Sequence, residues 1–256
     1  MGNEEWSAQG AYGVRFEWGP EGARRLVAGG DVACLVVVDV LSFTTAVSVA
    51  TDAGTRVFPH AWRDESAVAF ARERDAALAV GRRGVTEGSP WSLSPAALRR
   101  APFTPRLVLP SPNGSAIAAA AGASGVVVAG CLRNAAAVGS WLTDQGYGTA
   151  ERPLAVVAAG ERWPDDSLRP AVEDLLGAGA VISALRGAEV SPEATAAAAA
   201  YTACADLASA VTDCASGQEL ASYGFGQDVE VAVETGASQG VPVLTDGAFF
   251  SPDAAH

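Results

Sequence analysis

The sequence predicts a three-layer α/β fold, with helices on both faces of a largely parallel sheet. Three observations support this prediction: apolar runs without polar alternation, alanine-rich segments of helical length, and short polar turns between them. Strands that are buried on both faces have such continuous apolar sequences. We expect residues 1–256 to form one α/β domain, and the repeated units allow two similar intertwined halves of about 10–135 and 136–250.

The stretch from Val32 to Val57 is the clearest of the repeated units. Its apolar run ends at Asp39, and the segment from Ala46 to Ala53 predicts a helix that ends at Gly54. The strand thus brings one carboxylate to the edge at which open α/β sheets bind their ligands. Three hydroxyl residues between strand and helix suit a helix start, where free backbone N–H groups also attract phosphate: Ser42, Thr44 and Thr45.

The unit of strand, polar turn and helix returns in the middle of the chain. A strand over residues 106–109 precedes a turn that contains Asn113 and Gly114. Residues 116–121 are expected to form the helix, and residues 126–130 the next strand. Asn-Gly is a common turn pair, and its glycine also lets backbone N–H groups approach a phosphate.

A third copy of the unit has a longer and more charged turn, from Glu161 to Ser167. Its strand is expected over residues 154–160, and its helix carries Asp174 before a glycine-rich stop at residues 177–179. A short strand over residues 181–182 is expected after that stop. This copy therefore predicts a third polar turn, with carboxylates, at the end of a buried strand.

Right-handed crossovers place all three polar turns at the same edge of a shared sheet. We therefore pool Asp39, Asn113 and Asp174 into one candidate site and place Glu173 on a solvated helix face. The other expected elements are a half-exposed strand over 12–18, helices over 20–28, 66–79, 135–143, 192–214 (one or a pair) and 228–235, a loop over 81–95, a helix end and loop over 216–227, and an edge strand over 241–244.

The composition excludes several classes of chemistry. The net charge of −12 argues against nucleic acid or an anionic membrane as a partner. All 17 basic residues are arginines, which excludes a Walker-type phosphate loop and a Schiff-base lysine. Because there are only two histidines, a metal would be held by oxygen ligands, which suits Mg²⁺. The polar N-terminus and the four cysteines, interpreted as reduced thiols, predict a cytoplasmic protein.

Short motifs follow the predicted strands in a fixed order. They lie at residues 39–45, 111–115, 130–134, 159–160, 173–179, 216–220 and 228–229. In this order they resemble the motifs of the 2-phosphosulfolactate phosphatase family, over about residues 14–247. The resemblance implies a three-layer α/β/α fold and a Mg²⁺-dependent phosphatase that hydrolyses a small phosphorylated acid.

The resemblance also implies roles for individual residues. Asp39, Asn113 and Asp174 would be catalytic, and Asp39 and Asp174 would hold the metal. For Asp39 a role as the phosphoryl-accepting nucleophile stays open. The implied substrate-binding residues are Ser42, Thr44, Thr45, Gly114, Ser115, Arg133 and Asn134. The expected partner is a small phosphorylated anion, with neither nucleic acid nor membrane, and a homodimer is left open.

The chain departs from the family pattern near the first motif. Ser42 and Phe43 stand where the family usually has Arg and Ala, and Arg82 stands where it usually has Glu. We therefore expect a less cationic and more apolar site, which acts better on a less charged ester than on phosphosulfolactate. Two other classes stay open: a non-catalytic protein that binds a small anion or a partner on the same fold, and an enzyme of specialised metabolism that reuses the pocket.

Overall fold

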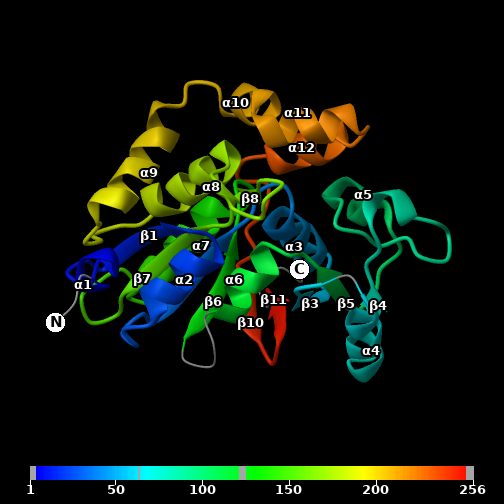
Figure 1. Cartoon of the computed structure of the whole chain (residues 1–256), viewed down its shortest axis with the longest axis horizontal. Helices are drawn as coiled ribbons and strands as arrows, with labels where there is room; N and C mark the ends of the chain where they lie inside the picture. Colours follow the sequence, from blue (N-terminus) through cyan, green and yellow to red (C-terminus); the bar gives the residue numbers. More distant parts are fainter. Residues whose placement is uncertain (1–3, 63, 121–124, 252–256) are drawn as a thin grey trace.

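The chain folds as three layers around one large sheet (Figure 1), as the sequence predicts. The structure is a computed structural model that describes residues 4–62, 64–120 and 125–251. Among these residues, nine strands form the sheet in the order β1-β7-β2-β6-β10-β11-β3-β5-β4, and β8 pairs with β9 in a separate hairpin. The strands are β1 (Val14–Trp18), β2 (Cys34–Val38), β3 (Arg56–His60), β4 (Ala77–Leu78), β5 (Arg106–Pro110), β6 (Val126–Gly130), β7 (Leu154–Ala158), β8 (Glu161–Arg162), β9 (Leu168–Arg169), β10 (Val243–Thr245) and β11 (Ala248–Phe250).

Helices cover both faces of the sheet, which the sequence pattern also predicts. They are α1 (Glu4–Ser7), α2 (Gly19–Val27), α3 (Phe43–Asp52), α4 (Glu65–Glu73), the 3-10 turn η1 (Arg82–Gly84), α5 (Pro95–Arg100), α6 (Gly114–Ala120), α7 (Ala135–Asp144), α8 (Val172–Ser183), α9 (Pro192–Ala203), α10 (Leu207–Asp213), α11 (Ala215–Ser222) and α12 (Gly226–Ala232). No helix in the described part of the chain is long and apolar enough to cross a membrane. The end of α6 that the sequence predicts at residue 121 lies outside the described residues.

The central strand β2 faces two separate hydrophobic cores. Val36 and Val38 join the core formed with α7, α8 and α9, whereas Leu35 and Val37 join the core formed with α2, α3 and α6. Successive side chains of a strand point to opposite faces, so every residue of this strand must be apolar. The absence of polar alternation in the sequence therefore has a direct structural cause.

Parallel pairing brings the ends of the central strands to one level. Val38 of β2 is in register with Gly130 of β6 and with Ala158 of β7. The residues that follow these strands therefore meet at one edge of the sheet, as the crossover rule requires. The strands expected near Val37, Val108, Val127 and Val157 all belong to this single sheet.

Two of the expected strands are wrong. The strand over residues 181–182 does not exist, because α8 continues through its glycines to Ser183. Nearly all of α8 is buried, so its apolar run resembles that of a buried strand. The strand near residue 243 lies inside the sheet and not at its edge: β10 pairs antiparallel with β6 and β11, and β11 pairs with β3.

Three smaller expectations also need correction. Helix α4 ends at Glu73, short of residue 79, because Asp75 takes a left-handed backbone conformation with φ 47°. The segment over residues 216–227, expected as a helix end and loop, contains most of the separate helix α11. Most of β1 is buried and not half-exposed, because α2 and α9 both pack against this strand.

The glycine at position 179 allows α8 and α9 to pack closely. A Cβ there would lie 2.2 Å from the carbonyl oxygen of Ala197 and 2.8 Å from Cβ of Tyr201. We predict that Gly179→Ala lowers the free energy of unfolding by about 1–3 kcal/mol, because the added methyl group overpacks this contact. Urea denaturation measures the change, with Gly88→Ala as control, since a Cβ at Gly88 meets nothing within 4 Å. Equal stability of the two variants would contradict the packing argument.

Candidate active site

The carboxylate of Asp39 lies at the end of β2 and binds two backbone N–H groups. Phe43 N donates to Oδ1 at 3.0 Å, and Gly114 N donates to Oδ2 at 3.0 Å. Phe43 begins α3 and Gly114 begins α6, so both N–H groups are helix-terminal donors without partners inside their helices. The side chain is only 7% exposed. Asp39 therefore joins the first and second polar turns of the sequence.

Close approach explains the glycine of the second turn. A Cβ on Gly114 would lie 2.3 Å from Cδ1 of Phe43 and 2.9 Å from Oδ2 of Asp39. Only a residue without a side chain lets its N–H group come this near to the carboxylate. The contribution of Gly114 to the site is thus its backbone donor.

Asp174 connects the ends of two neighbouring strands from the first turn of α8. Its Oδ1 accepts from Val40 N at 2.7 Å, and its Oδ2 accepts from Gly160 N at 2.8 Å. Val40 follows β2 and Gly160 follows β7, and the carboxylate is 3% exposed. Asp39 and Asp174 thus converge on one turn, as the pooling of the polar turns predicts.

Two further carboxylates lie near this pair. Glu161 follows Gly160 directly, and its Oε2 accepts from Asn113 Nδ2 at 3.2 Å, which brings the third pooled residue to the same edge. Glu173 is 2% exposed and accepts from Cys214 Sγ at 3.2 Å, so the expected solvated position of Glu173 is wrong. Helix α10 contacts α8, and Cys214, which directly precedes α11, lies against Glu173; the sequence pattern of α8 alone does not reveal this.

These carboxylates hold their protons more tightly than usual. Burial raises the pKa of Asp39 to about 6, against the opposing hydrogen bonds from Phe43 and Gly114. Burial raises the pKa of Glu161 to about 7, and the charges of Asp39 and Glu173 add to the shift. Burial, together with the charges of Asp39 and Glu173, places the pKa of Asp174 well above its usual value. Burial and mutual repulsion therefore both disfavour full ionisation of this group of carboxylates.

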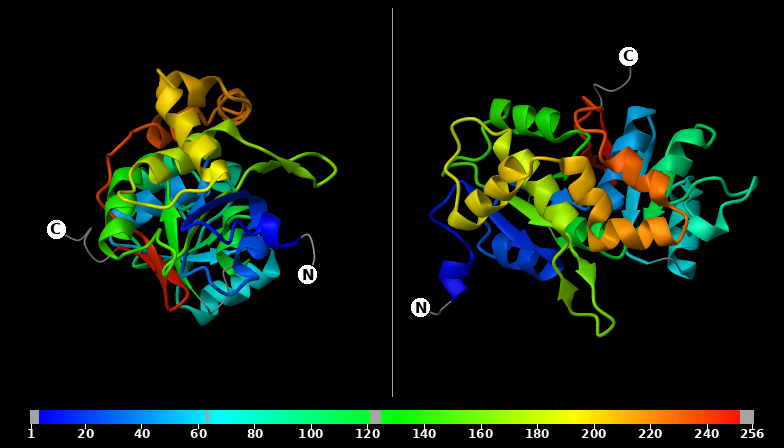
Figure 2. Two further views of the ribbon diagram at one scale, coloured as in Figure 1. Left: turned by 90° about the vertical axis from the view of Figure 1, so that its left-hand side faces the viewer. Right: turned by 90° about the horizontal axis from the view of Figure 1, so that it is seen from above.

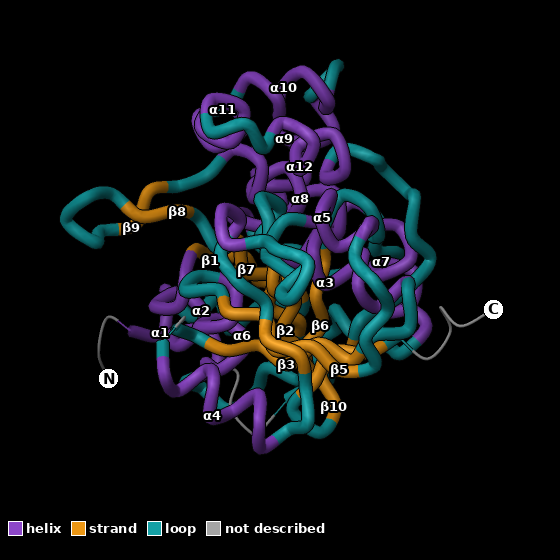
Figure 3. The backbone as a smooth tube through the Cα atoms, turned by 90° about the vertical axis from the view of Figure 1, so that its right-hand side faces the viewer, coloured by secondary structure: helices purple, strands orange, loops and turns teal. Residues whose placement is uncertain are grey.

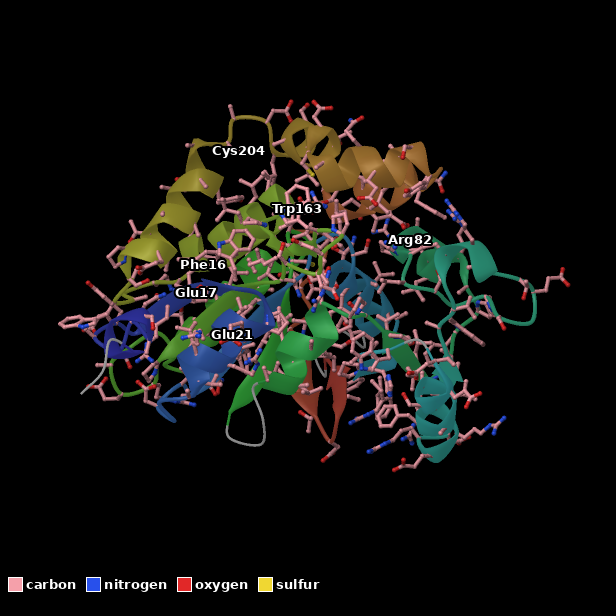
Figure 4. All side chains as sticks on the ribbon, viewed as in Figure 1. Phe16, Glu17, Glu21, Arg82, Trp163 and Cys204 are labelled. Atoms are coloured by element: carbon pink, nitrogen blue, oxygen red, sulfur yellow. The ribbon has the colours of Figure 1, made fainter. Side chains whose placement is uncertain are left out.

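Arg82, which Figure 4 labels, is one of the residues that line the same cleft as Glu161. Arg82 Nη2 donates to Ser42 Oγ at 2.5 Å, and Arg82 Nε donates to Asp228 Oδ2 at 2.9 Å. Asp228 is 1% exposed and also accepts from the hydroxyl of Ser94 and from Ala96 N, so it anchors residues 81–96 to α12. The Arg82 guanidinium is thereby fixed next to the first polar turn.

The remaining predicted binding residues have other partners. Thr44 Oγ1 donates to the carbonyl of Asp39 at 2.8 Å, and Thr45 Oγ1 donates to the carbonyl of Val40 at 2.7 Å, so both hydroxyls hold the turn itself. Ser115 is buried, and its Oγ has no hydrogen-bond partner among the described residues. This orphan hydroxyl directly follows the backbone donor of Gly114.

Arg133 and Asn134 do not join the group of carboxylates. Arg133 is 4% exposed and forms ion pairs with Asp52 and Glu234. Asn134 uses its amide to bind backbone, since its Oδ1 accepts from Cys131 N at 2.8 Å and its Nδ2 donates to the carbonyl of Ala129 at 3.1 Å. It occupies the N-cap position of α7, yet its side chain makes no capping hydrogen bond. Both side chains stabilise the loop after β6.

A cleft of 590 Å³ opens beside the carboxylates. Its lining includes Leu41, Arg82, Arg83, Glu161, Tyr223 and Phe225. Glu161 also lines a smaller hollow of 230 Å³ together with Asn113. The β8–β9 hairpin, which begins at Glu161, projects from the body of the molecule (Figures 2 and 3). The cleft gives a ligand access to the edge where the strands end.

Fold and site together define a class of protein: an α/β protein with an acidic, oxygen-rich site at the carboxyl edge of a mostly parallel sheet. Within that class, the chain belongs to the 2-phosphosulpholactate phosphatase family, whose model matches residues 24–247. The family is a phosphatase family, and the match confirms the resemblance of the motifs. No curated protein matches the chain.

Glu161 and Arg82 belong to the site but are not among the site residues that the sequence predicts. Glu161 follows its strand by three residues, close to the place that Asp39 takes after β2, and this repeated position was the available signal. The contact of Arg82 with Ser42 joins residues 40 positions apart, and no local sequence pattern predicts it. For this contact, the sequence offers one hint: Ser42 and Arg82 both depart from the family pattern.

The raised pKa of Glu161 makes stability depend on pH. A folded pKa of about 7, above the ordinary 4.5, stabilises the protein below pH 4.5, and this contribution is lost as the pH rises through 7. We predict that Glu161→Gln, which cannot ionise, raises the free energy of unfolding at pH 8 by on the order of 1–3 kcal/mol and changes it little at pH 4. Urea denaturation in a chelator at both pH values measures this, with the exposed Glu230→Gln as control. An equal effect at both pH values would contradict the prediction.

Proposed function

We propose that the protein is a phosphoric monoester hydrolase that acts at the edge where β2 and β7 end, with Mg²⁺ as cofactor. The observation that carries the proposal is the convergence of Asp39, Asp174 and Glu161. None of the three forms an ion pair with any described residue. Membership of a phosphatase family supports the same reaction type.

The chemistry of the donor set fits a hard divalent cation. Both oxygens of Asp174 accept N–H groups, as those of an ionised carboxylate do, yet burial and neighbouring charges favour the protonated form. A nearby cation would resolve this conflict. Among residues 4–62, 64–120 and 125–251, no three acidic, cysteine or histidine side chains are placed to hold a metal together. Mg²⁺ typically uses one or two carboxylates plus water and substrate phosphate, so Asp39 and Asp174 suffice as ligands.

Bound Mg²⁺ would neutralise charge on the phosphate. Arg82 and Glu161 would then have separate roles in binding and catalysis. Arg82 has guanidinium N–H groups beyond those that bind Ser42 and Asp228, and these can bind phosphate oxygens at the cleft. Glu161, with a pKa of about 7, can accept a proton from the attacking water near neutral pH. Water adds to phosphorus, the ester P–O bond breaks, and the alcohol leaves with a proton.

We predict that Mg²⁺ raises Tm by roughly 3–5 °C at ten times its Kd, because it binds the folded state only. Asp39→Asn should lose most of that rise in Tm, because the amide lacks the negative charge that binds the cation. The same variant should lose the Mg²⁺-dependent release of phosphate from an aryl phosphate. Calorimetry and a phosphate assay measure both effects. Asp165→Asn, on the exposed hairpin, is the matched control and should keep both.

Failure of Mg²⁺ to stabilise the protein or to support any phosphate release would overturn the proposal. Binding of Mg²⁺ or of a phosphate ester without turnover would support the second candidate, a small-anion binding protein. The deep burial of Asp39 and Asp174 favours that candidate, because it restricts the access of an attacking water and a substrate to the two carboxylates.

We predict that Arg82→Gln raises KM for a phosphomonoester about 10- to 100-fold with a smaller change in kcat, because a charge-assisted contact to the phosphate is lost. Arg82→Lys should lie between, since an ammonium keeps the charge without the planar fork. Steady-state kinetics with Arg186→Gln as control tests this, because Arg186 forms an exposed ion pair with Asp144. An unchanged KM in Arg82→Gln would exclude Arg82 as the anion contact.

A further inference from the structure

The cleft beside the carboxylates is larger than a three-carbon acid requires. Its volume is 590 Å³. Pockets of about 300–1,000 Å³ typically enclose drug-sized molecules. A phosphate held at Arg82 would leave most of this space to the organic part of the ester. The volume therefore favours a bulky organic group.

Aromatic rings paired with guanidinium groups line the cleft. The guanidinium of Arg83 lies 5.1 Å from the ring centre of Tyr223, and that of Arg82 lies 5.8 Å from the ring centre of Phe225. Tyr223 is 54% exposed, so a large part of its ring is available to a ligand. Flat surfaces of this kind bind flat groups by stacking, and an aromatic ligand would cover the exposed ring.

The charges of the cleft also restrict its ligand. Asp228 forms an ion pair with Arg82 and so offsets part of its charge, while Arg83 is the second guanidinium of the lining. Glu161 and Glu219 line the same cleft and would repel additional carboxylates or sulfonates. Leu41 and Leu220 add apolar surface. An uncharged flat group suits this lining better than a polyanion does.

We propose that the cleft binds an aromatic phosphomonoester, with the ring against Tyr223 and the phosphate at Arg82. The proposal rests on the proposed function for turnover, but its binding part can be tested separately. The ligand class is a phosphate ester of an alcohol or phenol that carries a single aromatic ring or two fused aromatic rings. The exposed ring of Tyr223 makes this residue a determinant of substrate specificity.

The test compares 1-naphthyl phosphate with 3-phosphoglycerate in the full chain with Mg²⁺. We expect kcat/KM to be at least tenfold higher for the naphthyl ester, and Tyr223→Ala to reduce that ratio about five- to twentyfold. Tyr12→Ala, an exposed tyrosine outside the cleft, is the matched control and should keep the ratio. A ratio near one, or a ratio that Tyr223→Ala does not change, overturns the proposal.

Binding of 1-naphthylmethyl phosphonate, which cannot be hydrolysed, separates this proposal from the proposed function. Calorimetric binding that Tyr223→Ala weakens, without turnover of any ester, supports the cleft proposal and contradicts the phosphatase. Turnover of 3-phosphoglycerate without phosphonate binding supports the phosphatase and overturns the cleft proposal. Circular dichroism of both variants checks that they fold.

Discussion

The carboxylate of Asp174 is the contact on which the site edge depends. It binds the N–H group after β2 and the N–H group after β7, so it fixes two strand ends to the first turn of α8. A carboxylate in the first turn of a helix is stabilised by the helix dipole, which partly offsets the cost of its burial. Gly177, one turn further along α8, permits the same approach, because a Cβ there would lie 2.6 Å from Val40. Close packing and polar contact thus act together at this edge.

The sequence predicts this edge well because its signals are local. Continuous apolar runs identify β2, β6 and β7, and the residue after β2 is the acidic Asp39. Parallel register then requires the turns to meet, and the hydrogen bond between Gly114 N and Asp39 agrees. Fold class and the meeting of the three turns could therefore be derived without coordinates.

The rest could not be derived because it depends on contacts between distant segments. The β10–β11 hairpin enters the sheet between β6 and β3, and no pattern in residues 241–250 marks a central place. Glu173 lies against Cys214, at the junction of α10 and α11, and Arg82 reaches Ser42 because Asp228 anchors it from α12. The side-chain amide of Asn134 likewise binds the N–H group of Cys131 and the carbonyl of Ala129. The presence of an asparagine does not by itself indicate this role.

Ser42 and Arg82 form one contact between two distant segments of the chain. A hydroxyl at Ser42 leaves room and an acceptor for a guanidinium, and Arg82 fills that place from a different segment. This arrangement requires Asp228, which would otherwise be a buried carboxylate without a cation, so three positions depend on one another. Because Arg82 also lies over Phe225, its position is coupled to the aromatic wall of the cleft. The proposed anion contact and the shape of the cleft therefore depend on the same side chain.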